Sequence, residues 1–177
     1  MAATTLVSVD EYLRSDYEPD MDYVDGVLEE RNVGELEHSA LQTQLSAWIV
    51  AHGWRHGIDV FTEQRTQIGA TRVRVPDLVL VKGRRKRGDL VLAQPPLAVI
   101  EILSPEDRIT RMHERIDDLL SIGAPSVFLI DPSSRRAWEH TRSGSHELHD
   151  AVLRIADPAF EIPLPEIFAQ IDERIED

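Results

Sequence analysis

The sequence contains no cysteine, which excludes disulfide bonds, thiolate metal sites and cysteine nucleophiles. A chain without cysteine fits a reducing compartment, so we expect a cytoplasmic protein. No apolar run approaches the roughly 20 residues that a membrane-spanning helix needs, and no membrane segment is expected. Residues 1–13 have neither a basic flank nor a long apolar stretch, so we expect no secretion signal.

Several well-marked catalytic and binding motifs are also absent. The sequence has no Gly-x-Ser-x-Gly nucleophile elbow and no phosphate-binding loop that ends in Gly-Lys-Ser or Gly-Lys-Thr. It has no zinc module and no recognisable DNA-reading helix. These absences exclude the hydrolase and nucleotide-binding classes that depend on such motifs.

The charge balance is strongly acidic, since 32 Asp and Glu residues against 19 Lys and Arg give a net charge of -13. The acids are concentrated in residues 16–37 and 147–177, whereas residues 82–87 form a short basic run. Cationic side chains dominate the affinity of proteins for nucleic acids. Any binding of phosphates would therefore use a local patch, and the basic run is either such a patch or a solvated loop.

The elements expected along the chain alternate between helices and strands, and 177 residues are enough for one domain with a sizeable core. We therefore predict a single α/β domain over residues 1–177, in which a mixed β-sheet is flanked by helices. Its expected parts are an N-terminal helix and hairpin (1–34), a core (35–140) and a C-terminal extension (141–177).

Capping, turn and periodicity signals set the bounds of the individual elements. Ser8 and Glu11 form a capping box, Asp25-Gly26 is a hairpin turn, and Gly53 ends a helix. These and similar signals predict helices at 8–13, 35–52, 104–122 and from 165 onward. Apolar and β-branched runs predict a hairpin at 22–32 and strands at 58–63, 65–69, 73–81, 97–103, 126–131 and 135–140.

Two acids interrupt the strongest apolar strands. Asp77 lies within residues 73–81 and Glu101 within residues 97–103, and each has apolar neighbours on its own face of the strand. An ionised carboxylate in such a position is costly unless it is paired or binds a cation. A backbone hydrogen bond beside Pro76, or an arginine partner, would explain either acid alone. If the two strands are neighbours, the pair offers the hard oxygen ligands that suit Mg²⁺.

Six segments, taken in order, resemble the PD-(D/E)XK nuclease superfamily. They are DYVDGVLEE, GELEHSALQTQL, FTEQRTQI, RVRVPDLVLV, VIEILSPEDR and LLSIGAPSVFLIDPSSRRAWEH. The segments are most similar to a bacterial branch of restriction-endonuclease-like proteins that was first catalogued as a domain of unknown function. The resemblance covers about residues 10–140 and implies a restriction-endonuclease-like fold.

The resemblance implies a metal-dependent endonuclease that hydrolyses phosphodiester bonds of DNA. Asp77 and Glu101 would hold Mg²⁺ or Mn²⁺, which polarises the phosphate and generates a hydroxide nucleophile. The family's lysine normally lies two positions after the glutamate, where this sequence has Leu103. In this branch the lysine commonly lies on the following helix, and the matching residue is Arg115. Arginine stays charged, so Arg115 could stabilise phosphate charge but could not accept a proton.

Five further residues are candidates for the site. Glu63 lies where the family often has an additional acid or polar group, and His38 matches a histidine typical of the branch. A surface acid and a packing histidine are the alternative interpretations. Arg74, Arg84 and Arg85 are candidates for contacts with a phosphate backbone, although an exposed strand or a solvated loop would have the same composition.

Two functions remain open from the sequence. The first is a Mg²⁺-dependent DNA endonuclease, with Asp77 and Glu101 as metal ligands and Arg115 as electrostatic support. The alternative is a catalytically reduced nuclease-fold protein that acts as a binding or self-association module, which the acidic composition and the missing lysine favour. The family and the edge hairpin expected near residues 135–146 also predict a homodimer.

Overall fold

The computed structural model describes residues 6–31, 35–83, 86–105, 107 and 109–175. Its helices are α1 (Val9–Arg14), α2 (Leu36–Gly53), α3 (Ile109–Ser121) and α4 (Leu164–Asp172), and a short 3-10 helix, η1 (Trp54–His56), follows α2. Ser8 caps α1 by accepting the N–H of Glu11, as the capping box predicts. α3 begins later than the expected start at residue 104. None of the described helices is long and apolar enough to cross a membrane.

The described strands form three sheets. Their bounds are β1 (Asp22–Val24), β2 (Val27–Glu29), β3 (Ile58–Thr62), β4 (Thr66–Gly69), β5 (Arg72–Arg74), β6 (Leu78–Lys82), β7 (Ala98–Ile102), β8 (Val127–Asp131), β9 (Arg136–Thr141), β10 (Gly144–Glu147), β11 (Val152–Ile155) and β12 (Phe160–Pro163). The central sheet has six strands in the order β10-β9-β8-β7-β6-β3, and it is mixed because only β7 and β8 run parallel. A four-stranded sheet, β2-β1-β5-β4, and the β11-β12 hairpin complete the fold.

The sequence predicts one continuous strand over residues 73–81, and this prediction is wrong because the run is divided between two sheets. β5 ends at Arg74 and pairs with β1 and β4, whereas β6 begins at Leu78 and pairs with β3 and β7. Pro76 lies in the break, where it has no N–H to donate to a ladder. Asp77 consequently lies at the junction of the two sheets, directly before β6.

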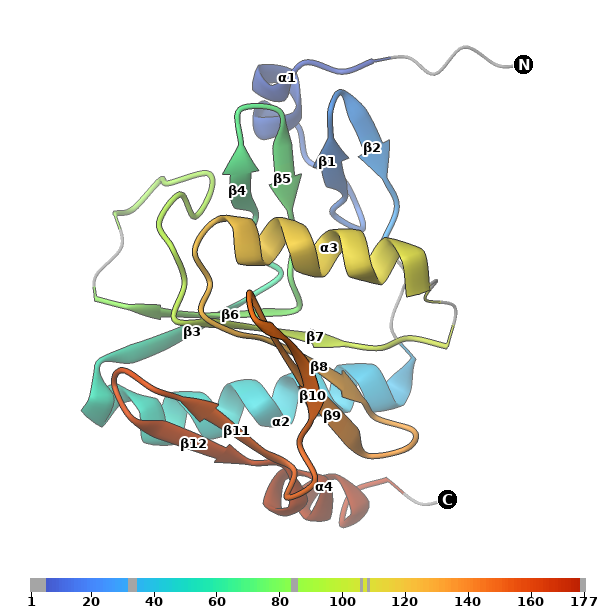
Figure 1. Cartoon of the computed structure of the whole chain (residues 1–177). Coiled ribbons are helices and arrows are strands. Elements are labelled where there is room, and N and C mark those ends of the chain that lie inside the picture. The colour runs from blue at the N-terminus through green and yellow to red at the C-terminus, as the bar shows by residue number, and fades with distance from the viewer. Residues whose placement is uncertain (1–5, 32–34, 84–85, 106, 108, 176–177) are drawn as a thin grey trace.

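Helices cover both faces of the six-stranded sheet (Figure 1). On one face α2 packs with the β11-β12 hairpin and α4, and the apolar side chains between them include Leu41, Leu45, Ile100, Phe128 and Ile162. On the other face α3 packs through Met112, Ile116 and Leu119 against Val79, Val99 and Val127. Figure 1 shows α3 between this face and the four-stranded sheet, so the N-terminal hairpin, α3, the start of β6 and the end of β7 meet in one region.

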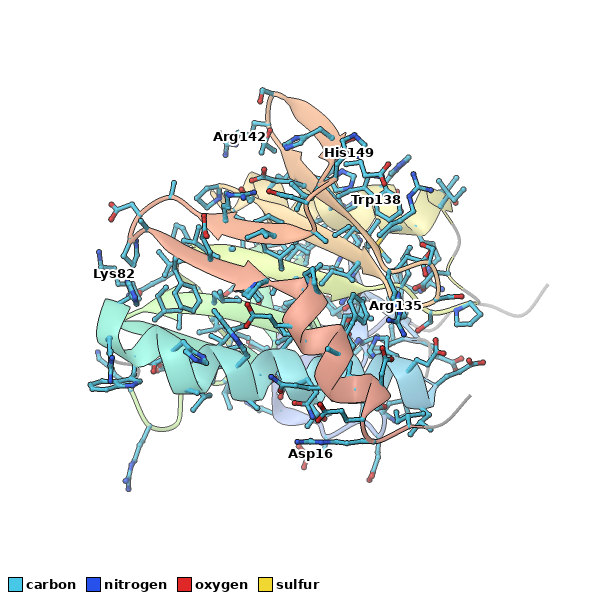
Figure 2. All side chains as sticks on the ribbon, turned by 90° about the horizontal axis from the view of Figure 1, so that it is seen from below. Asp16, Lys82, Arg135, Trp138, Arg142 and His149 are labelled. Carbon is cyan, nitrogen blue, oxygen red and sulfur yellow. The ribbon has the colours of Figure 1, made fainter. Side chains whose placement is uncertain are left out.

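The C-terminal part of the chain contains more structure than the sequence predicts. A terminal helix is expected there and α4 confirms it, but the β11-β12 hairpin is not among the expected elements. Leu153 and Ile162 of the hairpin are fully buried in the core beside α2. Arg135, which lies next to α4 in Figure 2, donates two hydrogen bonds to Asp172 at 2.9 and 2.6 Å. These contacts attach the C-terminal segment to the α2 face of the sheet.

Candidate active site

The two acids singled out in the sequence lie together in one cavity. β6 and β7 are antiparallel neighbours with Leu78 opposite Ile100. Asp77 and Glu101 therefore lie one residue beyond this pair, side by side on neighbouring segments of the chain. Both residues are buried, with exposed fractions of 4% and 2%. They line a cavity of about 520 Å³ together with residues of the N-terminal hairpin, α2 and α3.

Both carboxylate oxygens of Asp77 are hydrogen-bonded. Oδ2 accepts the N–H of Ile102 at 2.8 Å and lies 3.3 Å from Nε2 of His38, while Oδ1 accepts Nη2 of Arg31 at 2.8 Å. Burial alone would raise the pKa of Asp77, but the hydrogen bond and charge of His38, with the charges of Arg115 and Arg31, hold that pKa below its usual value. Asp77 is therefore ionised at neutral pH.

The first half of α2 supports Asp77 through two residues one helical turn apart. His38 contacts the carboxylate, and Gln42 donates from Nε2 to the Asp77 carbonyl at 3.0 Å. Burial lowers the pKa of His38, but the contact with Asp77 outweighs it and the pKa is raised. The candidate His38 therefore lies in the cavity as a partner of the carboxylate.

Glu101 is held by Arg115, which extends from α3. Nε of Arg115 donates to Oε1 of Glu101 at 2.8 Å, Nη1 donates to Asp22, and Nη2 donates to the carbonyl of Val75. Burial raises the pKa of Glu101 to about 7, with a further contribution from Asp77, although the charge of Arg115 acts in the opposite direction. Arg115 is thus fixed at each of its three guanidinium nitrogens.

Asp22 is a residue of this cavity that sequence reasoning missed. Its Oδ1 accepts the N–H of Val75 at 2.8 Å, and its Oδ2 accepts Nη1 of Arg74 at 3.0 Å as well as Nη1 of Arg115. Asp22 begins β1 and is only 3% exposed. The N-terminal hairpin therefore supplies the carboxylate that joins Arg74 to Arg115.

Arg74 was a candidate for contact with a phosphate backbone on an exposed strand, and the structure instead buries it to 2% exposure. Besides Asp22, its guanidinium donates to Glu29 at 2.9 Å and to Asp118 at 2.8 Å. These three carboxylates take up the donors that a phosphate would need. Arg84 and Arg85, the other two candidates of this kind, lie outside the described residues.

Glu63 is not among the described residues that line the cavity, but it lies next to Asp77, because its N–H donates to the Asp77 carbonyl at 3.2 Å. The Glu63 side chain is 54% exposed, and its Oε1 lies 3.9 Å from Nη1 of Arg31. Arg31 was not among the residues selected from the sequence, although it contacts Asp77 directly. The signal that could have marked it is its isolation, because it is the single Lys or Arg in the acidic stretch 16–37.

The carboxylates of Asp77 and Glu101 fit a divalent cation whose remaining ligands are water and the substrate. Among the described residues no group of three or more His, Asp or Glu side chains is arranged to hold a metal ion. Mg²⁺, however, is typically bound by one or two carboxylates, with water and substrate phosphate completing the shell. The described lining has six carboxyl groups and four guanidinium groups, and two of the carboxyl groups are those of the adjacent Asp77 and Glu101.

The raised pKa values of Glu101 and His38 have a consequence for stability. The folded protein should bind more protons than the unfolded chain, between pH 4.5 and about 7 for Glu101 and above pH 6.5 for His38. The free energy of unfolding without metal is therefore expected to fall as pH rises from 5 to 7, by roughly 1 to 3 kcal/mol. Urea unfolding in EDTA measures it, and Glu101→Gln should flatten the slope. An unchanged slope in this variant would contradict the assignment to Glu101.

Comparisons with known proteins identify a related fold. The sequence model of the Uma2 family, described as "Putative restriction endonuclease", matches residues 9–170. The crystal structure of a "putative nuclease belonging to DUF820" from Anabaena variabilis ATCC 29413 has a TM-score of 0.77 and 22% sequence identity over 92% of this chain and 98% of that chain. The cryo-EM structure of the DrdV–DNA complex matches at a TM-score of 0.43, with 16% identity over 77% of this chain and 11% of that chain, which is too weak to support an inference. No curated protein matches the sequence.

The restriction-endonuclease-like fold expected from the sequence is thereby confirmed. The similarity to the Anabaena protein extends over nearly the whole of both chains, and both faces of the mixed sheet are covered by helices as predicted. At 22% identity this similarity concerns the fold, so the chemistry of the cavity has to be inferred from its own residues.

Proposed function

The chain belongs to the Uma2 family, and we propose that it is a metal-dependent endonuclease that hydrolyses phosphodiester bonds of DNA. The observation that carries the proposal is the buried pair of acids, Asp77 and Glu101, in a cavity whose described residues include more carboxyl groups than guanidinium groups. Burying two ionised carboxylates side by side is costly without a cation. A divalent metal ion would bind both of them, and water and a substrate phosphate would complete the coordination shell of the ion.

In this proposal Asp77 and Glu101 hold Mg²⁺ or Mn²⁺. The bound ion supplies a Lewis acid for the phosphate and lowers the pKa of water. The chain keeps Asp77 ionised through His38 and the N–H of Ile102, and it orients Glu101 through Arg115. These contacts prepare both carboxylates before any cation arrives.

Arg115 serves as electrostatic support in the proposed site. Its side chain is 12% exposed at the cavity, and its guanidinium stays charged and offsets the negative charge of Glu101 and Asp22. It cannot accept a proton from water, and Leu103, at the usual lysine position, has no titratable group. Proton removal from the attacking water would therefore depend on metal-lowered acidity rather than on a lysine base.

The alternative is a catalytically reduced protein that uses the same fold for binding or self-association. One observation favours it: Arg31 and Arg115 already pair with Asp77 and Glu101, so the acids have counter-charges without a metal. A protein that has given up catalysis could keep these ion pairs for stability alone. The two functions differ in whether a divalent cation binds at the acidic pair.

Thermal unfolding with Mn²⁺ separates the two functions. For the endonuclease we expect Tm to rise by about 5 to 10 °C when the free Mn²⁺ concentration is about 100 times its Kd, because only the folded protein holds the two carboxylates together. Asp77→Asn and Glu101→Gln should remove the rise, while Asp150→Asn, an exposed acid paired with Arg154, should retain it. No rise in the wild-type protein would support the alternative, and an equal rise in Asp77→Asn would place the metal elsewhere.

We also propose that the protein forms a homodimer in the cytoplasm. β10 lies at one edge of the six-stranded sheet, and its backbone could pair with the same strand of a second copy across a twofold axis. The organisation of residues 1–177 as a single domain also remains a prediction. Sedimentation equilibrium of the full chain would measure the oligomeric state.

A further inference from the structure

Arg31 occupies a position on Asp77 that a bound metal ion would need. Oδ2 of Asp77 contacts the N–H of Ile102 and His38, so Oδ1 is the carboxylate oxygen that remains to bind a metal ion. Nη2 of Arg31 lies 2.8 Å from that oxygen, and the Arg31 side chain is only 13% exposed. A divalent cation on Oδ1 would therefore meet a guanidinium that already donates to the same atom.

Arg115 is held quite differently from Arg31. Its three guanidinium nitrogens donate to Glu101, Asp22 and Val75, which come from three different strands or strand ends. Moving Arg115 would break all three contacts at once and leave Asp22 with one guanidinium partner, Arg74, among the described residues. Arg31 follows β2 at the edge of the cavity, and to move away from Asp77 it gives up one hydrogen bond to a described residue.

A second carboxylate is already within reach of Arg31. Nη1 lies 3.9 Å from Oε1 of Glu63, whose side chain is half exposed. A small rotation of the Arg31 side chain would shorten this distance and lengthen the one to Asp77. The guanidinium of Arg31 therefore has two carboxylate partners, the buried Asp77 and the solvent-exposed Glu63.

We propose that Arg31 is an exchangeable cation of the acidic pair: it neutralises Asp77 in the metal-free protein and transfers to Glu63 when a divalent cation takes Oδ1 of Asp77. The proposal rests on the metal site proposed above and adds two residues to it. It gives Asp77 an additional counter-charge in the metal-free protein, and it gives Glu63 a role as the acceptor of the displaced arginine.

The test is calorimetric titration of the full-length protein with Mn²⁺ alone. Arg31→Met keeps the aliphatic stem and removes the competing charge, so Mn²⁺ should bind more tightly, on the order of tenfold. Arg111→Met is the matched control, because Arg111 lines the same cavity and donates to the carbonyl of Glu30 rather than to the acidic pair. It removes the same charge and should change the affinity much less.

Glu63→Gln tests the other half of the exchange with a variant that changes only an exposed side chain. Loss of the second partner should weaken Mn²⁺ binding a few-fold, since exposed pairs contribute little. In the Arg31→Met background the same substitution should have no further effect, because no guanidinium remains to be received. Equal effects of Glu63→Gln in both backgrounds would show that Glu63 acts independently of Arg31 and would overturn the exchange.

The remaining outcomes distinguish failure of the exchange from failure of the metal site. If the wild-type protein binds Mn²⁺ and Asp77→Asn does not, but Arg31→Met binds no more tightly than Arg111→Met, the exchange is wrong and the metal site stands. If neither the wild-type protein nor Arg31→Met binds Mn²⁺, both proposals fail. Binding that Asp77→Asn leaves unchanged would also remove both, since the ion would then lie elsewhere.

Discussion

Asp77→Asn is expected to reduce Mg²⁺-dependent cleavage of plasmid DNA by more than about 100-fold. Changing a residue that only supports a metal ligand typically costs 10- to 100-fold in affinity or activity, and Asp77 is proposed as a ligand itself. An asparagine side chain would keep the size of the group but would bring no negative charge to the cation. Glu101→Gln should have an effect of similar size for the same reason.

Loss of activity has to be separated from loss of folding, because Asp77 is buried and paired with Arg31 and His38. Circular dichroism and urea unfolding of each variant would establish how much folded protein is present. Asp150→Asn makes the same chemical change at an exposed ion pair and should cleave like the wild-type protein. The assay belongs at low salt, because a chain that offers few cationic side chains to phosphate would bind DNA weakly. Cleavage that persists in both Asp77→Asn and Glu101→Gln would come from a contaminating nuclease and would exclude the proposed mechanism.

Local signals in the sequence were sufficient for most elements of the fold. The cap at Ser8 and the turn at Asp25-Gly26, where both residues have positive φ of 49° and 93°, depend on a few consecutive residues. Pro76 shows the limit of such signals, because its β-branched neighbours favour a strand while its missing N–H interrupts the ladder. Which effect prevails depends on partner strands that the local sequence does not reveal.

The acidic pair was predictable for a different reason. Asp77 and Glu101 are conspicuous because each is an acid in an apolar segment, and the cost of burying a charge makes such positions stand out. Asp22 and Arg31 have no such context, since both lie in a stretch rich in acids. The contact of Asp22 with Arg115 joins residues 93 positions apart, so it could be recognised only after the hairpin and α3 had been placed.

Arg115 could be selected from the sequence, but its contacts could be recognised only in the fold. The resemblance to the nuclease superfamily directed attention to it, but that resemblance concerned a lysine that acts on the phosphate. The fold shows a guanidinium with three separate acceptors, and a lysine, with one ammonium group on a flexible chain, does not reproduce this planar arrangement. The role of Arg115 in holding Asp22, Val75 and Glu101 together therefore follows from geometry that the sequence did not contain.

Asp22→Asn is expected to lower the free energy of unfolding by about 3 to 5 kcal/mol, the usual cost of removing one partner from a buried ion pair. The Asp22 side chain is 4% exposed, and its Oδ2 accepts hydrogen bonds from both Arg74 and Arg115. Asparagine would retain an oxygen for the N–H of Val75 but would leave two buried guanidinium groups without this charge. A loss of this size is a large fraction of the 5 to 15 kcal/mol that typically stabilises a domain.

Asp25→Asn is the matched control, because Asp25 lies in the turn of the same hairpin and pairs with an arginine, Arg72. Its side chain is half exposed, and asparagine tolerates the positive φ at this position, so we expect a much smaller loss. Urea unfolding of both variants, analysed with a common slope, measures the difference. Equal losses would mean that Asp22 contributes no more than an exposed pair does. Arg115 would then owe its position mainly to Glu101 and Val75, and Asp22 would contribute little to organising the acidic pair.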